Sequence, residues 1–186
     1  MGCGWAEGLC VVDFDVEEGQ VVECGVPRGL FGGAVGAVVA CLAFPDSCAL
    51  GEEGQVCYWF GAGSGAERLF CCAVFCQRRD AARPRGYCQK SVVVASRLRL
   101  PAVLAALAEA LSRAYWANGL RSDTLEEFLA ALQTAPSPAA LLHAGSSVTL
   151  ALGALPALEL RFRCGELLAD LSVPPGSALG ELATVG

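Results

Sequence analysis

The sequence predicts an α/β chain of the α+β type, in which a mostly antiparallel five-stranded sheet has helices on both faces and a short C-terminal strand pair follows. Two observations support this fold class. Short apolar runs typical of strands recur along the N-terminal half of the chain. Two longer runs with apolar residues at three- and four-residue steps, as in amphipathic helices, come directly after them.

At 186 residues the chain is long enough for one domain with a substantial core. Its hydrophobic fraction of 54%, against 17% charged residues, raises the question of a membrane span. The uncharged run Gly29 to Pro45 is rich in glycine and falls short of the roughly 20 apolar residues that a spanning helix needs. The N-terminus also lacks the pattern of a secretory signal. We therefore expect a cytoplasmic protein whose membrane association is peripheral at most.

Gly2 and Cys3 are residue types that accept acyl chains at a protein N-terminus. The myristoylation pattern requires Ser or Thr at the sixth position, where this chain has Ala6. A lipid anchor is therefore the less favoured interpretation, and acylation of Gly2 or Cys3 stays open.

Eleven cysteines would suggest disulfides in a secreted protein, but free thiols are the expectation in the cytosol. Their spacing does not suit zinc, because Cys71, Cys72 and Cys76 alternate between the two faces of one apolar strand. We expect buried free cysteines, no metal site and no cofactor. An enzyme with a catalytic cysteine would have only His143 as its base and is the least favoured hypothesis.

The first three elements follow from local patterns. Alternation over Cys10 to Val16 predicts a strand near a sheet edge, and Gln20 to Val26 returns as its hairpin partner. The run Ala34 to Ala43 lacks alternation and ends before Pro45, which predicts a helix. Gly36 weakens the prediction of where this helix begins.

Three further strands are predicted at Gln55 to Phe60, Leu69 to Cys76 and Tyr87 to Ser96. All three are apolar on both faces, which predicts that they are central and covered by helices. The glycine-rich stretch 61–67 between the first two resembles a phosphate-binding loop. It leads into a strand rather than a helix, so we expect a hairpin connection.

Two amphipathic helices follow the strands. The first begins at Pro101, and its apolar stripe ends near Tyr115. The second begins at Asp123, which forms a capping-box pattern with Glu126. Beyond them, residues 134–146 are predicted to be a linker, 147–164 a hairpin and 165–186 a tail that contains Pro and Gly.

Charge is distributed unevenly along the chain. The net charge is −6, with acidic residues in the first hairpin and basic residues between Arg78 and Arg99. Arginines in this segment could hold phosphate or carboxylate, or could form a solvated loop. Because aromatic residues do not alternate with these basic residues, we do not expect nucleic-acid binding.

Specific residues add a family resemblance. The segments are VVDFDVEEGQVVE from Val11, CLAFPDS from Cys41, GEEGQVCYWF from Gly51, and FCQRRDAARPRGYCQKSVVVASRL from Phe75. In this order they resemble the upstream DENN (uDENN) region of DENN domain-containing protein six and its relatives. The resemblance implies a longin-like module over residues 5–133, and the predicted order of strands and helices is that of such a module.

The resemblance implies a role as the N-terminal lobe of a guanine-nucleotide exchange factor for Rab-family GTPases, in vesicle traffic and at endosomal membranes. Exchange factors act by binding and not by covalent chemistry, so no catalytic residue is expected. In the family a central DENN lobe follows in the chain and shares the GTPase. We expect the tail to lead to such a second lobe, without which the exchange factor is incomplete. The alternative is a stand-alone longin-like binding module without exchange activity.

The resemblance also implies candidate contact residues for a partner. They are Phe44, Pro45, Asp46, Ser47, Arg79, Asp80, Arg85, Tyr87, Gln89 and Lys90. The aromatic and proline residues among them could instead serve packing or chain reversal. The charged residues could instead form a local salt-bridged turn. The helix Ala34 to Ala43 is more apolar than an exposed helix should be, so we expect the second lobe or another protein to cover it.

Overall fold

The computed structural model describes residues 5–45, 53–83, 85–135, 147–150 and 158–161. Several sequence predictions lie outside the described residues. They concern Asp46 and Ser47, most of the 134–146 linker, parts of the 147–164 hairpin, and the 165–186 tail.

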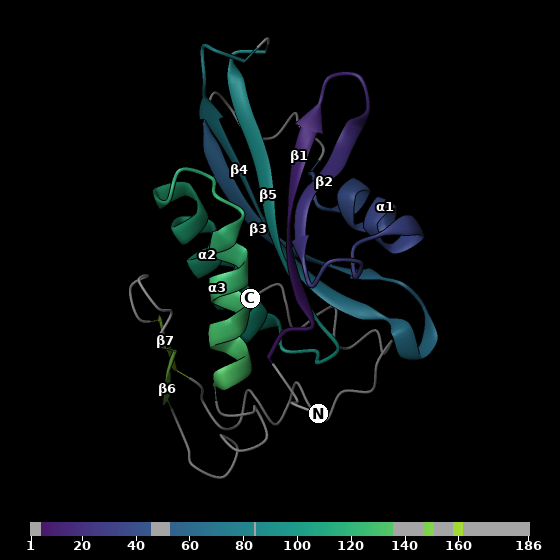
Figure 1. Ribbon diagram of the computed structural model, residues 1–186, viewed down its shortest axis with the longest axis vertical. Coiled ribbons are helices and arrows are strands. Elements are labelled where there is room, and N and C mark those ends of the chain that lie inside the picture. The colour runs from purple at the N-terminus through teal and green to yellow at the C-terminus, as the bar shows by residue number, and fades with distance from the viewer. Residues whose placement is uncertain (1–4, 46–52, 84, 136–146, 151–157, 162–186) are drawn as a thin grey trace.

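A five-stranded sheet forms the centre of the molecule, with the strand order β2-β1-β5-β4-β3 (Figure 1). Its strands are β1 (Gly8–Asp15), β2 (Gly19–Val26), β3 (Gly54–Ala62), β4 (Leu69–Arg79) and β5 (Tyr87–Ser96). Every neighbouring pair is antiparallel. A short turn of 3₁₀ helix, Gly65–Glu67, lies in the glycine-rich connection between β3 and β4, which is the predicted hairpin loop.

Helices cover both faces of the sheet, as predicted. One face carries α1 (Gly33–Leu42), and the other carries α2 (Pro101–Ala117) and α3 (Asp123–Thr134) (Figure 1). Alternation along β5 divides the core, because Val92 and Val94 pack toward α2 and α3, whereas Val93 packs toward α1. The separate antiparallel pair β6 (Ser147–Leu150) and β7 (Leu158–Arg161) completes the predicted α+β fold, which is consistent with a longin-like domain.

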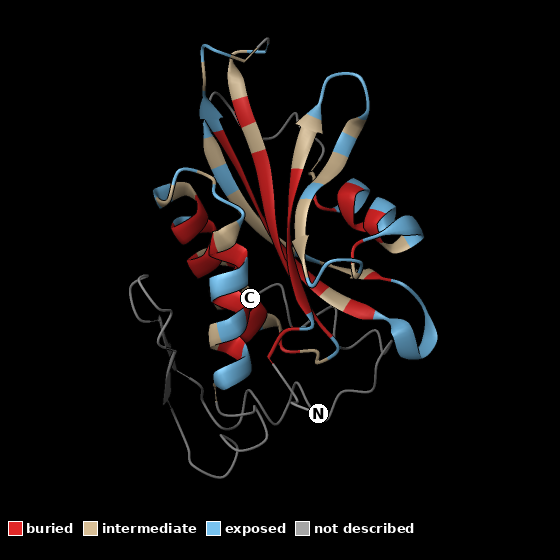
Figure 2. Ribbon diagram, in the orientation of Figure 1, coloured by how far each residue is buried: buried red, intermediate tan, exposed pale blue. Residues whose placement is uncertain are grey.

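The sheet order agrees with one predicted strand position and corrects another. β1 lies near a sheet edge, between the edge strand β2 and β5, although its residues Leu9 to Val12 are fully buried (Figure 2). β3, expected at the centre, lies at an edge. Its apolar residues pack partly under α1 and α2, and Trp59 donates a hydrogen bond to the Pro101 carbonyl at 3.1 Å. Cover by helices, rather than a central position, therefore explains the composition of β3.

Close approach of the chain explains the glycine near the start of α1. A Cβ atom at Gly36 would lie 1.8 Å from the carbonyl oxygen of Phe31, so a larger residue there would push α1 away from the preceding loop. The start of α3 also differs from the prediction, because its N-cap is Ser122 and makes no side-chain capping bond. Asp123 instead accepts a hydrogen bond from Arg121 Nε at 3.2 Å.

None of the helices in the described part of the chain combines the length and apolarity that a membrane span requires.

Candidate functional site

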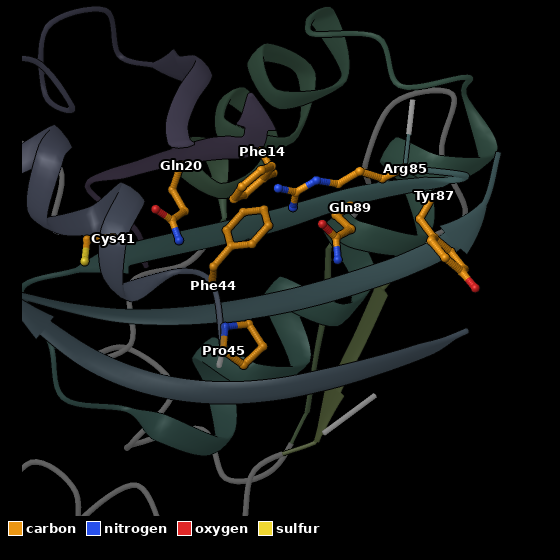
Figure 3. Close-up of a pocket in the computed structure, with 8 residues that line it drawn as sticks. All are labelled: Phe14, Gln20, Cys41, Phe44, Pro45, Arg85, Tyr87 and Gln89. Carbon is orange, nitrogen blue, oxygen red and sulfur yellow. The ribbon is translucent and has the colours of Figure 1, made fainter. Parts of the chain in front are cut away.

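A pocket of about 290 Å³ lies on the face of the sheet that carries α1, beyond the C-terminal end of this helix (Figure 3). The lining residues come from β1, β2, β5, the end of α1 and the loop before β5. They are Phe14, Gln20, Cys41, Phe44, Pro45, Arg85, Tyr87 and Gln89. Five of the predicted contact residues therefore line one site: Phe44, Pro45, Arg85, Tyr87 and Gln89.

The pocket forms because α1 is shorter than the strands beneath it. The helix has 10 residues, and the tips of the β1–β2 and β4–β5 hairpins extend past its end (Figure 1). The Ser91 hydroxyl donates a hydrogen bond to the Ala43 carbonyl, which fixes the end of the helix on β5. Phe44 and Pro45, which follow the helix, then line an open hollow together with Tyr87 and Gln89, which precede Ser91 on β5.

Aromatic rings form the base of the pocket. Phe44 packs edge-to-face on Phe75 with ring centroids 5.2 Å apart, and the centroid of Phe14 lies 6.2 Å from that of Phe44. Such pairs contribute about 0.5–1.5 kcal/mol beyond the burial of their area. The Phe44 ring, which follows the helix, is thereby held at a fixed place against the sheet.

Arg85 supplies the positive charge of the pocket. Its guanidinium carbon lies 4.3 Å from the centroid of the Phe14 ring, and Figure 3 shows the side chain reaching over that ring. The tight turn before β5 places it there, since Gly86 has φ +74° and its carbonyl accepts a hydrogen bond from the Asp80 N–H at 2.8 Å. Arg85 itself is exposed, so its charge is available to a ligand.

Polar groups stand around the aromatic base. The Gln89 side-chain amide donates to the Gln77 side-chain oxygen at 2.6 Å, which orients Gln89 beside the pocket. Gln20 lies opposite Phe14 in the β1–β2 register and projects into the same hollow (Figure 3). The Tyr87 ring points away from the phenylalanine pair and forms an outer wall (Figure 3). The arrangement combines an apolar floor, one cation and two side-chain amides.

Lys90 lies on the opposite face of the sheet and is buried, with 2% exposure. Its Nζ donates to Asp13 Oδ2 at 2.9 Å and to Glu23 Oε2 at 2.6 Å. Burial alone would lower the pKa of Lys90, but the hydrogen bonds to these two carboxylates outweigh it and raise the pKa. The Tyr115 hydroxyl also donates to Glu23 Oε2 at 3.2 Å, and burial followed by the Glu23 charge raises the pKa of Tyr115. Lys90 therefore connects strands and helix internally, and we do not include it in the proposed contact surface.

The remaining charged candidates lie at the β4–β5 loop beside the pocket. The Arg79 backbone N–H donates to the Glu53 carboxylate at 3.1 Å. Asp80 accepts from the Ala82 N–H at 3.0 Å and lies 3.9 Å from the Arg83 guanidinium, so it stabilises the loop locally. These two residues do not line the pocket.

The sequence interpretation missed three lining residues: Phe14, Gln20 and Cys41. The pattern contained a signal for the first two. The predicted hairpin pairs Phe14 with Gln20, and alternation places Phe14 on the face of Val12, under α1.

An uncharged surface continues from the pocket along α1. The helix sequence GAVGAVVACL contains no charged residue, and Val38 and Leu42 are 41% and 42% exposed. Cys41, which is also exposed on α1, reaches the pocket rim. Cys41 therefore joins the pocket to this exposed side of α1, which we call the α1 surface.

The lining residues do not combine a nucleophile with a base. Among the residues that the structure describes, no three His, Cys, Asp or Glu side chains gather as metal ligands would.

Comparison with known proteins gives two relatives. The chain is 32% identical over 99 residues to Protein DENND6 homolog of Dictyostelium discoideum, which covers 50% of this chain and 14% of that protein. It is 32% identical over 120 residues to Protein DENND6A of Gallus gallus, covering 50% of this chain and 20% of that protein. No family model matches the chain. The chain thus spans a fifth or less of the length of the curated relatives it matches.

Proposed function

This chain is related to the DENN family, and from that relationship we propose that it acts as the N-terminal lobe of a guanine-nucleotide exchange factor for a Rab-family GTPase. We further propose a cytoplasmic protein that works in vesicle traffic, at endosomal membranes and with peripheral association only.

One observation carries the proposal. The helix end at Phe44 and Pro45 and the strand start at Arg85, Tyr87 and Gln89 belong to two separate segments through which the sequence resembles the uDENN region. The fold brings both segments to a single pocket. Because both segments that resemble the uDENN region contribute to one surface, this surface supports a common role for them in partner contact.

The proposed mechanism is differential binding. A surface that binds the nucleotide-free GTPase more tightly than the nucleotide-bound form lowers nucleotide affinity by the same factor, because the two equilibria are linked. The pocket supplies groups suited to a switch segment: an aromatic floor at Phe14 and Phe44, and a cation at Arg85. The α1 surface, with Val38 and Leu42 exposed, is proposed to dock on a second DENN lobe, which shares the GTPase.

The proposal is tested by nucleotide release. Purified Rab GTPases loaded with a fluorescent GDP analogue are mixed with the chain, and the loss of fluorescence is followed. We expect little acceleration by the chain alone. When the chain is joined to a downstream central DENN lobe, we expect release from one member of the panel to rise about fivefold or more, the lower end of common coupling factors.

A Ras-family GTPase outside the Rab panel serves as the control and is expected to keep its basal release. Binding to a Rab without faster release, even with the second lobe joined, would instead assign the chain as a binding module, the alternative function. Neither binding nor release with any Rab would overturn both assignments.

A further inference from the structure

Two cysteines on neighbouring strands bring their thiols together away from the pocket. The Sγ atoms of Cys57 in β3 and Cys72 in β4 lie 3.4 Å apart. In the strand register Cys57 pairs with Val74 and Cys72 with Trp59, so the two cysteines are diagonal neighbours on the face covered by α2. We propose that Cys57 and Cys72 form an oxidisable thiol pair, which a hydroperoxide converts into a disulfide.

The two cysteines differ in access, which assigns their roles. Cys57 is half-buried on the edge strand, whereas Cys72 is fully buried. The two thiols share a hydrogen bond in which either sulfur could be the donor, and this bond lowers the pKa of Cys57 and raises that of Cys72. Because the thiolate is the nucleophile, Cys57 attacks the peroxide and Cys72 completes the reaction.

Other described cysteines lack this combination of access and pairing. Burial raises the pKa of Cys10, and it raises that of Cys71 to about 12. Burial also raises the pKa of Cys24 and Cys88. Cys41 is exposed on α1, which covers the opposite face of the sheet. Its rate of oxidation therefore shows what solvent exposure alone produces.

The reaction proceeds in two balanced steps. The Cys57 thiolate attacks the terminal oxygen of the hydroperoxide, so that an S–O bond forms, the O–O bond breaks, and an alcohol or water leaves after protonation. Cys72 Sγ then attacks the sulfur of the Cys57 sulfenic acid, forming the S–S bond and releasing water with the thiol proton. In sum, two thiols are oxidised and one hydroperoxide is reduced.

The position of Cys57 on an edge strand makes the closure feasible and gives it a consequence. An S–S bond is about 2.05 Å long, so the two sulfur atoms must approach each other from 3.4 Å. Because β3 has a strand neighbour on one side only within the described residues, it can shift toward β4 to allow this approach. The disulfide would tie β3 to β4 beside Trp59, whose indole N–H bonds the Pro101 carbonyl of α2. Oxidation is therefore expected to hold the edge strand more firmly on the sheet.

The experiment treats the folded wild-type chain with stoichiometric hydrogen peroxide, alkylates the remaining thiols and maps the peptides by mass spectrometry. We expect a Cys57–Cys72 cross-link, with Cys57 lost severalfold faster than Cys41, and higher protection of β3 amides from hydrogen exchange. In C72S the sulfenic acid at Cys57 is expected to persist and to react with dimedone. In C41S the cross-link is expected to be unchanged.

The wild-type map decides the proposal even where a variant does not fold. Absence of the cross-link in the wild-type chain overturns it. So does oxidation of Cys57 at the same rate as Cys41, or a cross-link that joins either cysteine to another partner instead. Circular dichroism of C72S, with C72A as a second variant, establishes that dimedone labelling reports a folded chain.

Discussion

Replacement of Trp5 by alanine is expected to lower the free energy of unfolding by about 3–5 kcal/mol, the usual cost of removing a large core aromatic. Trp5 has 0% exposure and belongs to the core between the sheet and α2 and α3, together with Leu9, Leu107 and Phe128. The residue lies just before β1, where the Glu7 N–H donates to the Ala95 carbonyl at 2.8 Å. Its loss would leave a cavity beneath the start of β1.

Urea denaturation followed by circular dichroism measures this change. Trp59 provides the matched control, because it is 40% exposed on the edge strand and W59A removes one hydrogen bond and partial burial. We expect W59A to cost about 1 kcal/mol and W5F to cost less than W5A. Equal losses for W5A and W59A would contradict the assignment of Trp5 to the core.

Replacement of Lys90 by methionine is expected to cost about 3 kcal/mol, because it leaves two carboxylates without their buried cation. Asp13 is 18% exposed and Glu23 is 41% exposed, so Glu23 can be solvated and the cost stays at the lower end for a broken buried pair. Adding D13N and E23Q to K90M is expected to recover part of the loss, since the neutral amides no longer repel each other.

The same denaturation measurement checks Lys90, with R113M as the control. Arg113 also pairs with a carboxylate, Glu109 at 3.8 Å, but its side chain is 65% exposed, so we expect a change below about 0.5 kcal/mol. Because the pKa of Lys90 is raised in the folded chain, its contribution to the free energy of unfolding depends on pH. This contribution is complete below the unfolded pKa near 10.4 and is lost as the pH rises through the folded pKa. Similar losses for K90M and R113M at neutral pH would show that Lys90 is not paired in the interior.

Local patterns predicted most of the fold because each element carries its own signal. The strand Tyr87–Ser96 has the predicted bounds, and α2 begins at the predicted Pro101. What local patterns could not supply was the order of strands. β1 lies beside β5 through pairs such as Asp13 with Lys90, which are distant in sequence, and so the interior position of β1 and the edge position of β3 follow from tertiary pairing alone.

The candidate site was predictable in part for the same reason. The family resemblance indicated residues on both sides of the pocket, such as Phe44 and Arg85, but it gave no face for each side chain. Strand alternation then separates them, because Gln89 faces the pocket and its neighbour Lys90 faces the opposite core. The burial of Lys90 depends on Asp13 and Glu23, whose approach only the folded sheet creates.

We propose that the pocket beside α1 is the surface that holds the GTPase. The most direct test is calorimetric titration of the responsive Rab GTPase, stripped of nucleotide, with wild type and the double variant Q20A/R85A. Both changed residues are exposed, so folding should be retained, and R113A on the opposite face is the matched control.

We expect Q20A/R85A to bind at least tenfold more weakly, which corresponds to about 1.4 kcal/mol, while R113A binds as wild type does. Melting curves of the three proteins should agree within a few degrees. Wild-type affinity in Q20A/R85A would contradict the account, because it would place the contact surface elsewhere on the chain.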